Sequence, residues 1–224
     1  MDIVPFIQFT FNTQYMLRWV YGGIVMYIPI LNFFSLGYLS KTSRLLMISN
    51  IGLPTWERKY DIWMDGLKLL FIFILYEAVP FFLFSCGFFL TTLGTIPAFF
   101  GHIMIKLSYI ALLIFSYFIP FAFATFSEQM DFKKALEFDK IQKAIREVLI
   151  PYLGGYIGTL FLLYICKWFL RIPYLIGFLF SSVLTYYALL LSTYYFTQLF
   201  RQTSLSMEKT EEETVYQDRS SSNP

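Results

Sequence analysis

Acidic residues recur at intervals of four in one polar stretch of an otherwise apolar sequence. This stretch, LPTWERKYDIWMDGLK at residues 53–68, contains Glu57, Asp61 and Asp65, with Trp63 between the last two. Residues four apart lie on one face of a helix, so the carboxylates would form an acidic ridge, and Trp63 would sit among lipid head groups. The ridge either binds a cation, a basic partner or a polar lipid head, or it belongs to a structural interfacial helix. In the structural interpretation Asp65 caps the next membrane span, and its replacement by Ala would lower stability by about 1 kcal/mol.

Glu77 is a second candidate, because it lies inside an apolar run that is long enough to cross a membrane. It is about ten residues into the run 67–93, which is roughly 15 Å along a helix. An acidic side chain at such a depth faces the bundle interior or water, and it is a functional candidate by default. Glu77 either is protonated and hydrogen-bonds inside the bundle beside Pro80, or serves as a site for a cargo or a proton. A Tyr or Ser hydroxyl, a proton, or Lys106 of the next run would neutralise it.

The residue types that most catalytic sites and metal sites require are missing. His102 is the single histidine, which leaves no second histidine for a metal site and argues against a Ser-His pair. The sequence has no Gly-rich phosphate loop, CxxC pair or HExxH motif, and Cys86 and Cys166 lie in separate apolar runs, where thiols usually pack. The Lys and Arg residues are dispersed, unlike those of a nucleic-acid interface. We therefore expect no enzyme activity, no cofactor, no metal and no nucleic-acid partner.

The composition predicts a membrane protein. Of the 224 residues, 57% are hydrophobic and 14% are charged, whereas a soluble domain has about a quarter of its residues charged. A span needs about 20 apolar residues, and five runs qualify: 19–38, 67–93, 99–126, 148–170 and 173–199. We expect an all-α, polytopic membrane bundle of about five transmembrane helices with amphipathic interfacial helices. Residues 1–200 would form a single transmembrane domain, followed by a disordered, charged tail at 201–224.

The first apolar run contains a proline that leaves its path open. Pro29 lies in the middle of the run 19–38, where a proline removes a backbone hydrogen bond and kinks or breaks a helix. The run either crosses the membrane with a kink, with the N-terminus outside, or enters and returns on one side, with the N-terminus in the cytoplasm.

Lys and Arg residues set the expected orientation of the chain. The segments 39–68 and 127–147 each contain five of them, and 94–98 contains none. Cytoplasmic loops hold the excess of Lys and Arg, so both polar loops and the C-terminal tail are predicted to be cytoplasmic. Residues 128–149 have the pattern of an amphipathic helix, which either lies on the inner membrane surface and recruits a partner, or is a connector packed on the bundle.

Two glycines near the start of the fourth run predict a close helix contact. Gly154 and Gly158 form a GxxxG pair, which favours close approach of two helices in a membrane. The contact could lie within the chain or between two copies of it.

The sequence resembles the prokaryotic membrane-protein family DUF4013, a domain of unknown function. The resemblance runs from about residue 12 to 200 and depends on the patterns GG…IP…GY, LP…W…DGLK and Y…P, and on ALEFDKI. The matching positions are Gly23, Pro29, Gly37, Tyr38, Leu53, Pro54, Trp63, Asp65, Gly66, Leu67, Lys68, Tyr76, Pro80, Ala135, Phe138 and Ile141. The resemblance implies a multi-pass protein of a bacterial or archaeal plasma membrane, with no assigned activity. Thr55-Trp56 replaces the acidic residue that usually follows Leu-Pro in the family, and the tail from 201 looks like an addition.

Together these patterns predict a non-catalytic membrane component. It would bind membrane lipid or a membrane-protein partner at its cytoplasmic face, through the 53–68 box and the 128–149 segment, and it could form a homo-oligomer. The alternative is a small transporter or lipid-handling protein that uses Glu77 and the Pro-broken spans as a path.

Overall fold

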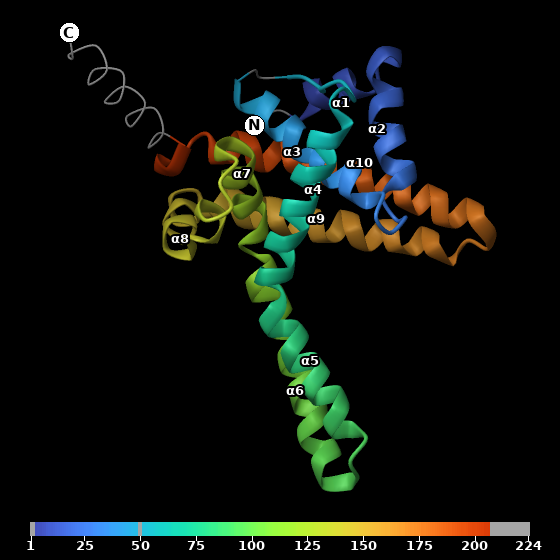
Figure 1. The fold of residues 1–224 in the computed structure, drawn as a ribbon, viewed down its shortest axis with the longest axis vertical. Coiled ribbons are helices and arrows are strands. Elements are labelled where there is room, and N and C mark those ends of the chain that lie inside the picture. The colour runs from blue at the N-terminus through green and yellow to red at the C-terminus, as the bar shows by residue number, and fades with distance from the viewer. Residues whose placement is uncertain (1–2, 49–50, 207–224) are drawn as a thin grey trace.

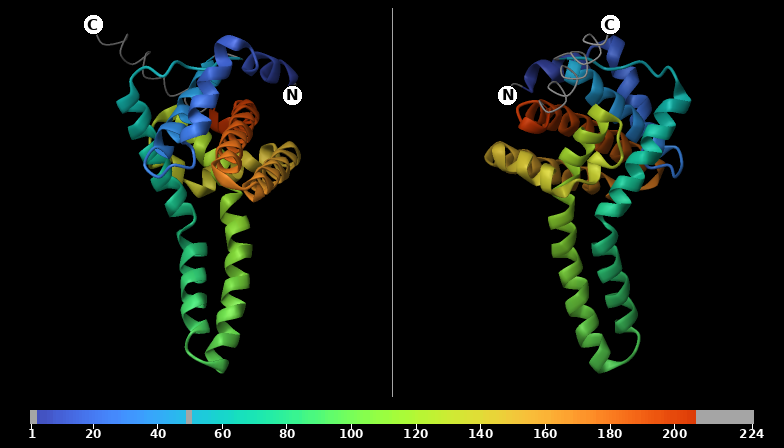
Figure 2. Two further views of the ribbon diagram at one scale, coloured as in Figure 1. Left: turned by 90° about the vertical axis from the view of Figure 1, so that its right-hand side faces the viewer. Right: turned by 60° about the vertical axis from the view of Figure 1, so that its left-hand side comes forward.

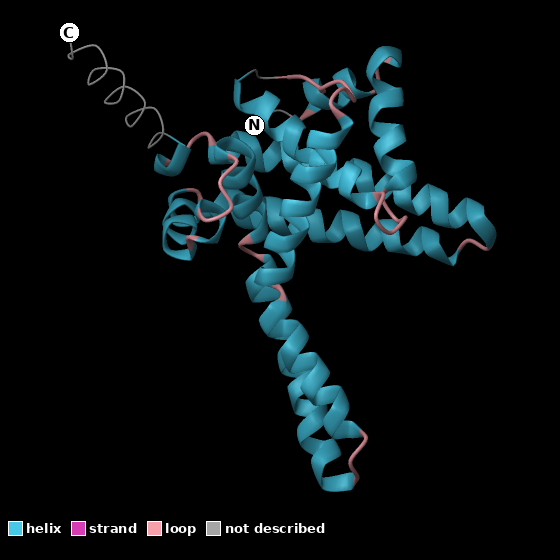
Figure 3. Cartoon of the chain, in the orientation of Figure 1, coloured by secondary structure: helices cyan, strands magenta, loops and turns pink. Residues whose placement is uncertain are grey.

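Helices make up all the regular structure of the residues that the structure describes, which are 3–48 and 51–206 (Figures 1 and 3). The structure is a computed structural model. The helices are α1 (Val4–Thr10), α2 (Thr13–Val25), α3 (Asn32–Ile48), α4 (Lys59–Tyr76), α5 (Ala78–Thr91), α6 (Thr95–Ser116), α7 (Ile119–Gln129), η1 (Lys134–Leu136), α8 (Phe138–Glu147), α9 (Leu149–Trp168), η2 (Phe169–Arg171) and α10 (Tyr174–Phe200). The predicted all-α class is confirmed.

Three helical stretches of the described chain are long and apolar enough to cross a membrane. They are Thr95–Gln129, Leu149–Arg171 and Leu175–Phe200. A fourth crossing is formed if α4 and α5, which are bent by 56° at Glu77, count as one broken span. The break has a local cause, because Pro80 has no N–H to donate to the carbonyl of Tyr76 and its ring clashes with that carbonyl. The count is therefore three or four spans, below the five expected.

The expected span that the structure lacks is the first apolar run, 19–38. Its residues belong to two helices, α2 and α3, and not to one. α2 ends at Val25 and α3 begins at Asn32, with Pro29 in the break and Ile30 in the left-handed region at φ 70°. The chain then turns back, because the Ser35 hydroxyl of α3 donates to the Gly22 carbonyl of α2 at 2.7 Å. A single kinked crossing over 19–38 is thus wrong, and the helix–turn–helix agrees with the alternative in which the chain returns.

Two apolar hairpins extend from a body that contains α1 to α4, α7, α8 and the C-terminal part of α10 (Figures 1 and 2). One is the α5–α6 arm, and the other is formed by α9 and α10; the turns at 92–94 and 169–173 lie at their far ends. The two helices of the arm meet at Gly87 and Gly101, where a Cβ on Gly101 would lie 2.6 Å from the Gly87 carbonyl oxygen. Most other arm side chains are exposed in the protein, which is the pattern of a hairpin that faces lipid.

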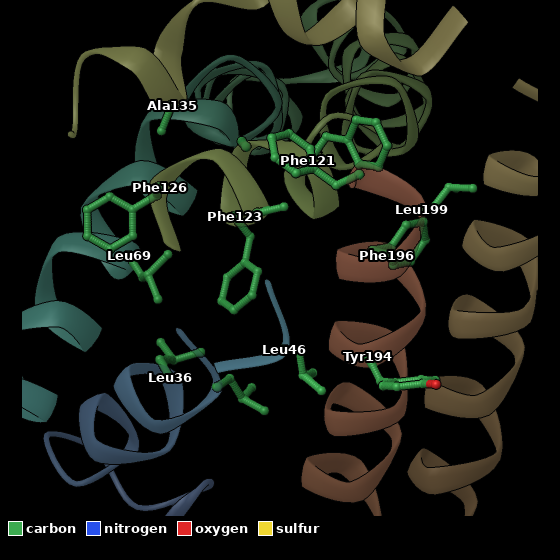
Figure 4. Close-up of a cluster of buried hydrophobic side chains, with 14 of the residues drawn as sticks. Leu36, Leu46, Leu69, Phe121, Phe123, Phe126, Ala135, Tyr194, Phe196 and Leu199 are labelled. Atoms are coloured by element: carbon green, nitrogen blue, oxygen red, sulfur yellow. The ribbon is translucent and has the colours of Figure 1, made fainter. Parts of the chain in front are cut away.

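α10 is the helix around which the body packs. It contacts α2, α3, α7 and α9, and its inner residues join one hydrophobic core (Figure 4). That core includes Leu36, Leu46, Leu69, Phe121, Phe126, Tyr194, Phe196 and Leu199. Thr203 and Leu205 are also buried, so residues 201–206 pack on the body instead of belonging to a disordered tail. Residues 207–224 lie outside the described part of the chain.

The segment 128–149 is a connector, not one amphipathic helix. α7 ends at Gln129, Met130 takes a positive φ of 55°, and a short η1 leads into α8. Ile141 and Ile145 of α8 are buried in the core, so the apolar face of α8 packs on the protein and is not free for a membrane surface. Glu147, at the end of α8, accepts hydrogen bonds from the Ser204 N–H at 2.8 Å and hydroxyl at 2.5 Å, which lower the pKa of Glu147.

α3 and α4 touch through their backbones at two glycines of the resemblance pattern. A Cβ on Gly37 would lie 1.7 Å from the Ile62 carbonyl oxygen, and one on Gly66 would lie 1.8 Å from the Phe33 carbonyl oxygen. Both distances are far below van der Waals contact, so any larger residue at either position must push the helices apart.

We therefore predict that Gly66→Ala lowers the free energy of unfolding by about 1–3 kcal/mol, the usual cost of overpacking a core. Thermal unfolding in detergent measures the change. Gly158→Ala is the matched control, because a Cβ there would meet no atom within 4 Å; as a helical Gly→Ala change it should be neutral or stabilise by up to about 1 kcal/mol. Equal unfolding temperatures for the two variants would contradict the contact.

Candidate functional site

The first half of the 53–68 box is a loop that is fastened to α2 and α3. The Tyr38 hydroxyl donates to the Pro54 carbonyl at 2.8 Å, and the Arg18 guanidinium donates to the Leu53 carbonyl at 2.8 Å. The Trp56 indole N–H donates to the Arg18 carbonyl at 3.0 Å, and its ring stacks on Tyr38 with 4.2 Å between the centroids. Burial raises the pKa of Tyr38, so its hydroxyl keeps the proton that it donates. These bonds fix residues 53–56 on both α2 and α3.

Asp65 does not cap a helix. α4 begins at Lys59, so Asp65 lies inside the helix, where it is buried with 9% of its surface exposed. Its carboxylate pairs with the Arg44 guanidinium, with 3.3 Å between Oδ2 and Nη2. Arg44 also donates from Nε to the Ser127 carbonyl at 3.2 Å and contacts the Met130 sulfur. The expected cap is thus replaced by an ion pair that joins α3, α4 and the end of α7.

The other acids of the box do not gather with Asp65 into a site. Glu57 precedes α4, and both Glu57 and Asp61 are exposed, so the three carboxylates do not form one helical ridge. Trp63 is half-buried and lies edge-on to Phe33, with ring centroids 5.7 Å apart. Among the described residues no group of three His, Cys, Asp or Glu side chains could hold a metal. Asp65 and Trp63 therefore pack inside the protein, but not as the cap and the interfacial helix that the structural interpretation predicted.

Glu77 lies at the bend between α4 and α5. Its Oε2 atom is buried and has no hydrogen-bond partner among the described residues. The ion pairs found within the same residues do not include it, and Lys106 is exposed in the α5–α6 arm. Next to it, the Tyr76 hydroxyl donates to the Ala135 carbonyl at 2.9 Å and fixes the end of α4 on η1. The functional role of Glu77 stays a prediction.

A pocket of about 310 Å³ lies where α9 and α10 meet the body. It is lined by Leu36, Leu39, Phe73, Ser116, Ile119, Pro120, Phe123, Tyr156, Thr159, Leu160, Leu163, Leu189, Ser192, Thr193 and Phe196. Figure 4 shows Phe123 of α7 pointing between α3, which carries Leu36, and α10, which carries Phe196. The lining is apolar apart from neutral hydroxyl groups.

Four of the five hydroxyl groups that line the pocket form two pairs. Tyr156 bonds Ser116 at 2.7 Å between oxygens, and Thr159 bonds Ser192 at 2.8 Å. These residues were not identified from the sequence, because each is an isolated hydroxyl in an apolar run. They come from three helices, α6, α9 and α10, so the pairs become visible only when the helices that face one another are known.

The GxxxG pair of α9 does not make the expected contact within the described chain. A Cβ on Gly154 or Gly158 would meet nothing within 4 Å. Gly155 makes the close approach instead, because a Cβ there would lie 2.2 Å from a ring carbon of Tyr195 on α10.

The long apolar helices, the polar segments between them and the pocket walled by spans define a multi-pass helical membrane protein. More particularly, the chain belongs to the DUF4013 family, described as a protein of unknown function, which matches residues 21–185. No match to the chain was found among curated proteins or among solved structures.

We predict that Asp65→Ala destabilises the protein by about 1–2 kcal/mol, because it leaves Arg44 without its partner in a partly buried setting. The estimate is below that of a fully buried pair because water reaches the Arg44 side chain, which is 37% exposed. Unfolding in detergent measures it, with Asp61→Ala on the exposed side of α4 as control, expected within about 0.5 kcal/mol of wild type. In a double-mutant cycle with Arg44→Met, strict additivity would show that the ion pair contributes nothing.

Proposed function

We propose that the protein is a non-catalytic membrane component that binds the chain of a lipid in its inter-helix pocket. The observation that carries this proposal is the pocket itself. Its volume of about 310 Å³ lies at the lower end of the roughly 300–1,000 Å³ range of ligand pockets, which suits one hydrocarbon chain.

The position of the pocket favours a ligand from the bilayer. α9 and α10 supply more than half of its lining residues, and both belong to stretches apolar enough to span a membrane. A ligand that reaches the pocket between these helices comes from hydrocarbon, where an acyl or isoprenoid chain is available.

The chemistry of the lining supports binding rather than catalysis. None of the residues that line the pocket is a His, Cys, Asp, Glu, Lys or Arg, so its hydroxyl groups have no base among the lining residues to activate them. In the 53–68 box, which the sequence offered as a recognition surface, Trp56 and Asp65 make internal contacts, whereas Glu57 and Asp61 are exposed. The proposal therefore keeps lipid as the partner and moves the binding site from the box to the pocket.

We further propose a plasma-membrane location with both polar loops and the residues after α10 on the cytoplasmic side. With four spans, residues 39–58, 130–148 and 201–206 fall on one side, and the turns at 92–94 and 169–173 fall on the other. The first group contains most of the Lys and Arg residues, as cytoplasmic segments do. A bacterial or archaeal membrane is what the family resemblance implies.

We predict that Leu163→Trp, which fills the pocket, removes most of the labelling by a lipid with a photoreactive group on its acyl chain. Mass spectrometry of the cross-linked peptides from α9 and α10 measures the labelling in native membrane patches. Leu162→Trp is the matched control, because Leu162 is the neighbouring leucine of α9, is exposed and does not line the pocket. Equal labelling of these peptides in the two variants would refute the pocket as the lipid site.

A further inference from the structure

We propose that Glu77 holds the head group of the bound lipid, and that this lipid is a neutral one with a free hydroxyl, of the monoacylglycerol type. This inference rests on the proposed lipid site and adds the identity of its polar end. The carboxyl oxygen of Glu77 accepts a hydrogen bond from the head-group hydroxyl while the chain lies in the pocket.

The first step is the position of Glu77 beside the pocket. Phe73, which lines the pocket, is one helical turn before Glu77 on α4. Tyr156 of α9 lines the same pocket, and its hydroxyl bonds Ser116 at the end of α6, the helix that packs against α5. Glu77 therefore lies at the end of the pocket that Phe73 and Tyr156 define.

The packing of the arm gives the same placement independently. Gly87 of α5 faces Gly101 and Ile105 of α6. Because α5 and α6 form a hairpin and run antiparallel, moving ten residues back from Gly87 to Glu77 corresponds to moving about ten residues forward on α6. That brings Glu77 close to Leu113, whose carbonyl accepts a hydrogen bond from Tyr156 at 3.1 Å.

The second step is the unmet hydrogen-bonding capacity of Glu77. Its buried Oε2 has no partner among the described residues, although buried polar atoms in proteins are nearly always paired. By contrast, the hydroxyl groups of Tyr156 and Ser116 already bond each other. The group that is missing at this end of the pocket is a hydrogen-bond donor.

The third step is the charge of the head group. The pocket lining contains no Lys or Arg, so a phosphate there would lack a cationic partner and would face the Glu77 carboxyl. A neutral hydroxyl group meets neither difficulty, since it donates to the carboxyl and needs no counter-charge.

The test compares two probes that have the same oleoyl chain. 1-Oleoylglycerol has a neutral head group, and oleoyl lysophosphatidic acid has a phosphate on the same glycerol. Native mass spectrometry of the full-length protein in detergent gives the apparent Kd of each. Wild type should bind 1-oleoylglycerol more tightly; equal binding or a preference for the phosphate would overturn the proposal without any variant.

The variants separate the head-group contact from the pocket. Glu77→Leu removes the acceptor and should weaken 1-oleoylglycerol binding about tenfold, as loss of one hydrogen bond does. Glu77→Gln keeps an acceptor oxygen and should stay within about threefold of wild type. If Glu77→Gln loses as much as Glu77→Leu, an acceptor oxygen is not what the site needs, and the proposed hydrogen bond from a neutral hydroxyl to Glu77 is wrong.

The two proposals fail in different ways. If Glu77→Leu binds 1-oleoylglycerol like wild type while Leu163→Trp does not, the pocket holds the chain but Glu77 does not hold the head group. If Leu163→Trp also binds it like wild type, the proposed lipid site itself is wrong. Thermal unfolding of each variant checks that the loss of binding is not loss of fold.

Discussion

The backbone contact between α3 and α4 is the constraint on which the rest of the body depends. At Gly37 and Gly66 each helix presents a carbonyl oxygen at the place where a side chain would begin on the other. Only this close approach lets the Arg44 guanidinium of α3 reach the Asp65 carboxylate of α4 and the Ser127 carbonyl of α7 together. Residues 53–56, which precede α4, then form hydrogen bonds with α2 and α3. Asp65 and Gly66 are thus adjacent residues with different roles. The Asp65 carboxylate forms the ion pair with Arg44, and Gly66, which has no side chain, allows the backbones of α3 and α4 to touch.

Pairs of hydroxyl groups join neighbouring helices inside the otherwise apolar body. Hydroxyl pairs such as Ser43 with Thr197, at 2.7 Å, and Ser40 with Ser127, at 3.0 Å, join helices without placing a charge in the core. In each pair the two hydroxyl groups meet each other's need for a hydrogen-bond partner. They also fix the position of one helix along the other, which apolar contacts alone would not do. Glu77 departs from this pattern, because it is an acid at a helix break whose buried oxygen has no donor among residues 3–48 and 51–206. The buried polar atoms of Asn32, Gln129 and Tyr186 also have no partner among the described residues; Glu77 differs from them in lying at a helix break beside the pocket.

Single-sequence reasoning succeeded where the signal is local and failed where it depends on a distant partner. The long apolar runs identified α6, α9 and α10, and Pro29 marked the break between α2 and α3. The spacing of acids in the box suggested a continuous helix, but the helix begins only at Lys59, after Arg58 takes a positive φ. The partner of Asp65 could not be found either, because Arg44 lies 21 residues away on another helix. The pocket was invisible for the same reason, since its hydroxyl groups come from different helices. The rotation of α9, which turns Gly155 and not Gly154 toward α10, is likewise decided by packing.

The packing of α2 against α10 ties the two ends of the chain together. The Ser182 hydroxyl of α10 donates to the Gly23 carbonyl of α2 at 2.6 Å, across 159 residues of sequence, and a Cβ on Gly23 would lie 2.7 Å from the Val183 backbone. On the ribosome, α2 therefore emerges long before its main partner exists, and the body cannot close until α10 has been synthesised. The α5–α6 arm is made in between and finds its contacts within itself, so it can enter the bilayer while the rest waits. The packing of α2 in the body is therefore complete only when α10 is present.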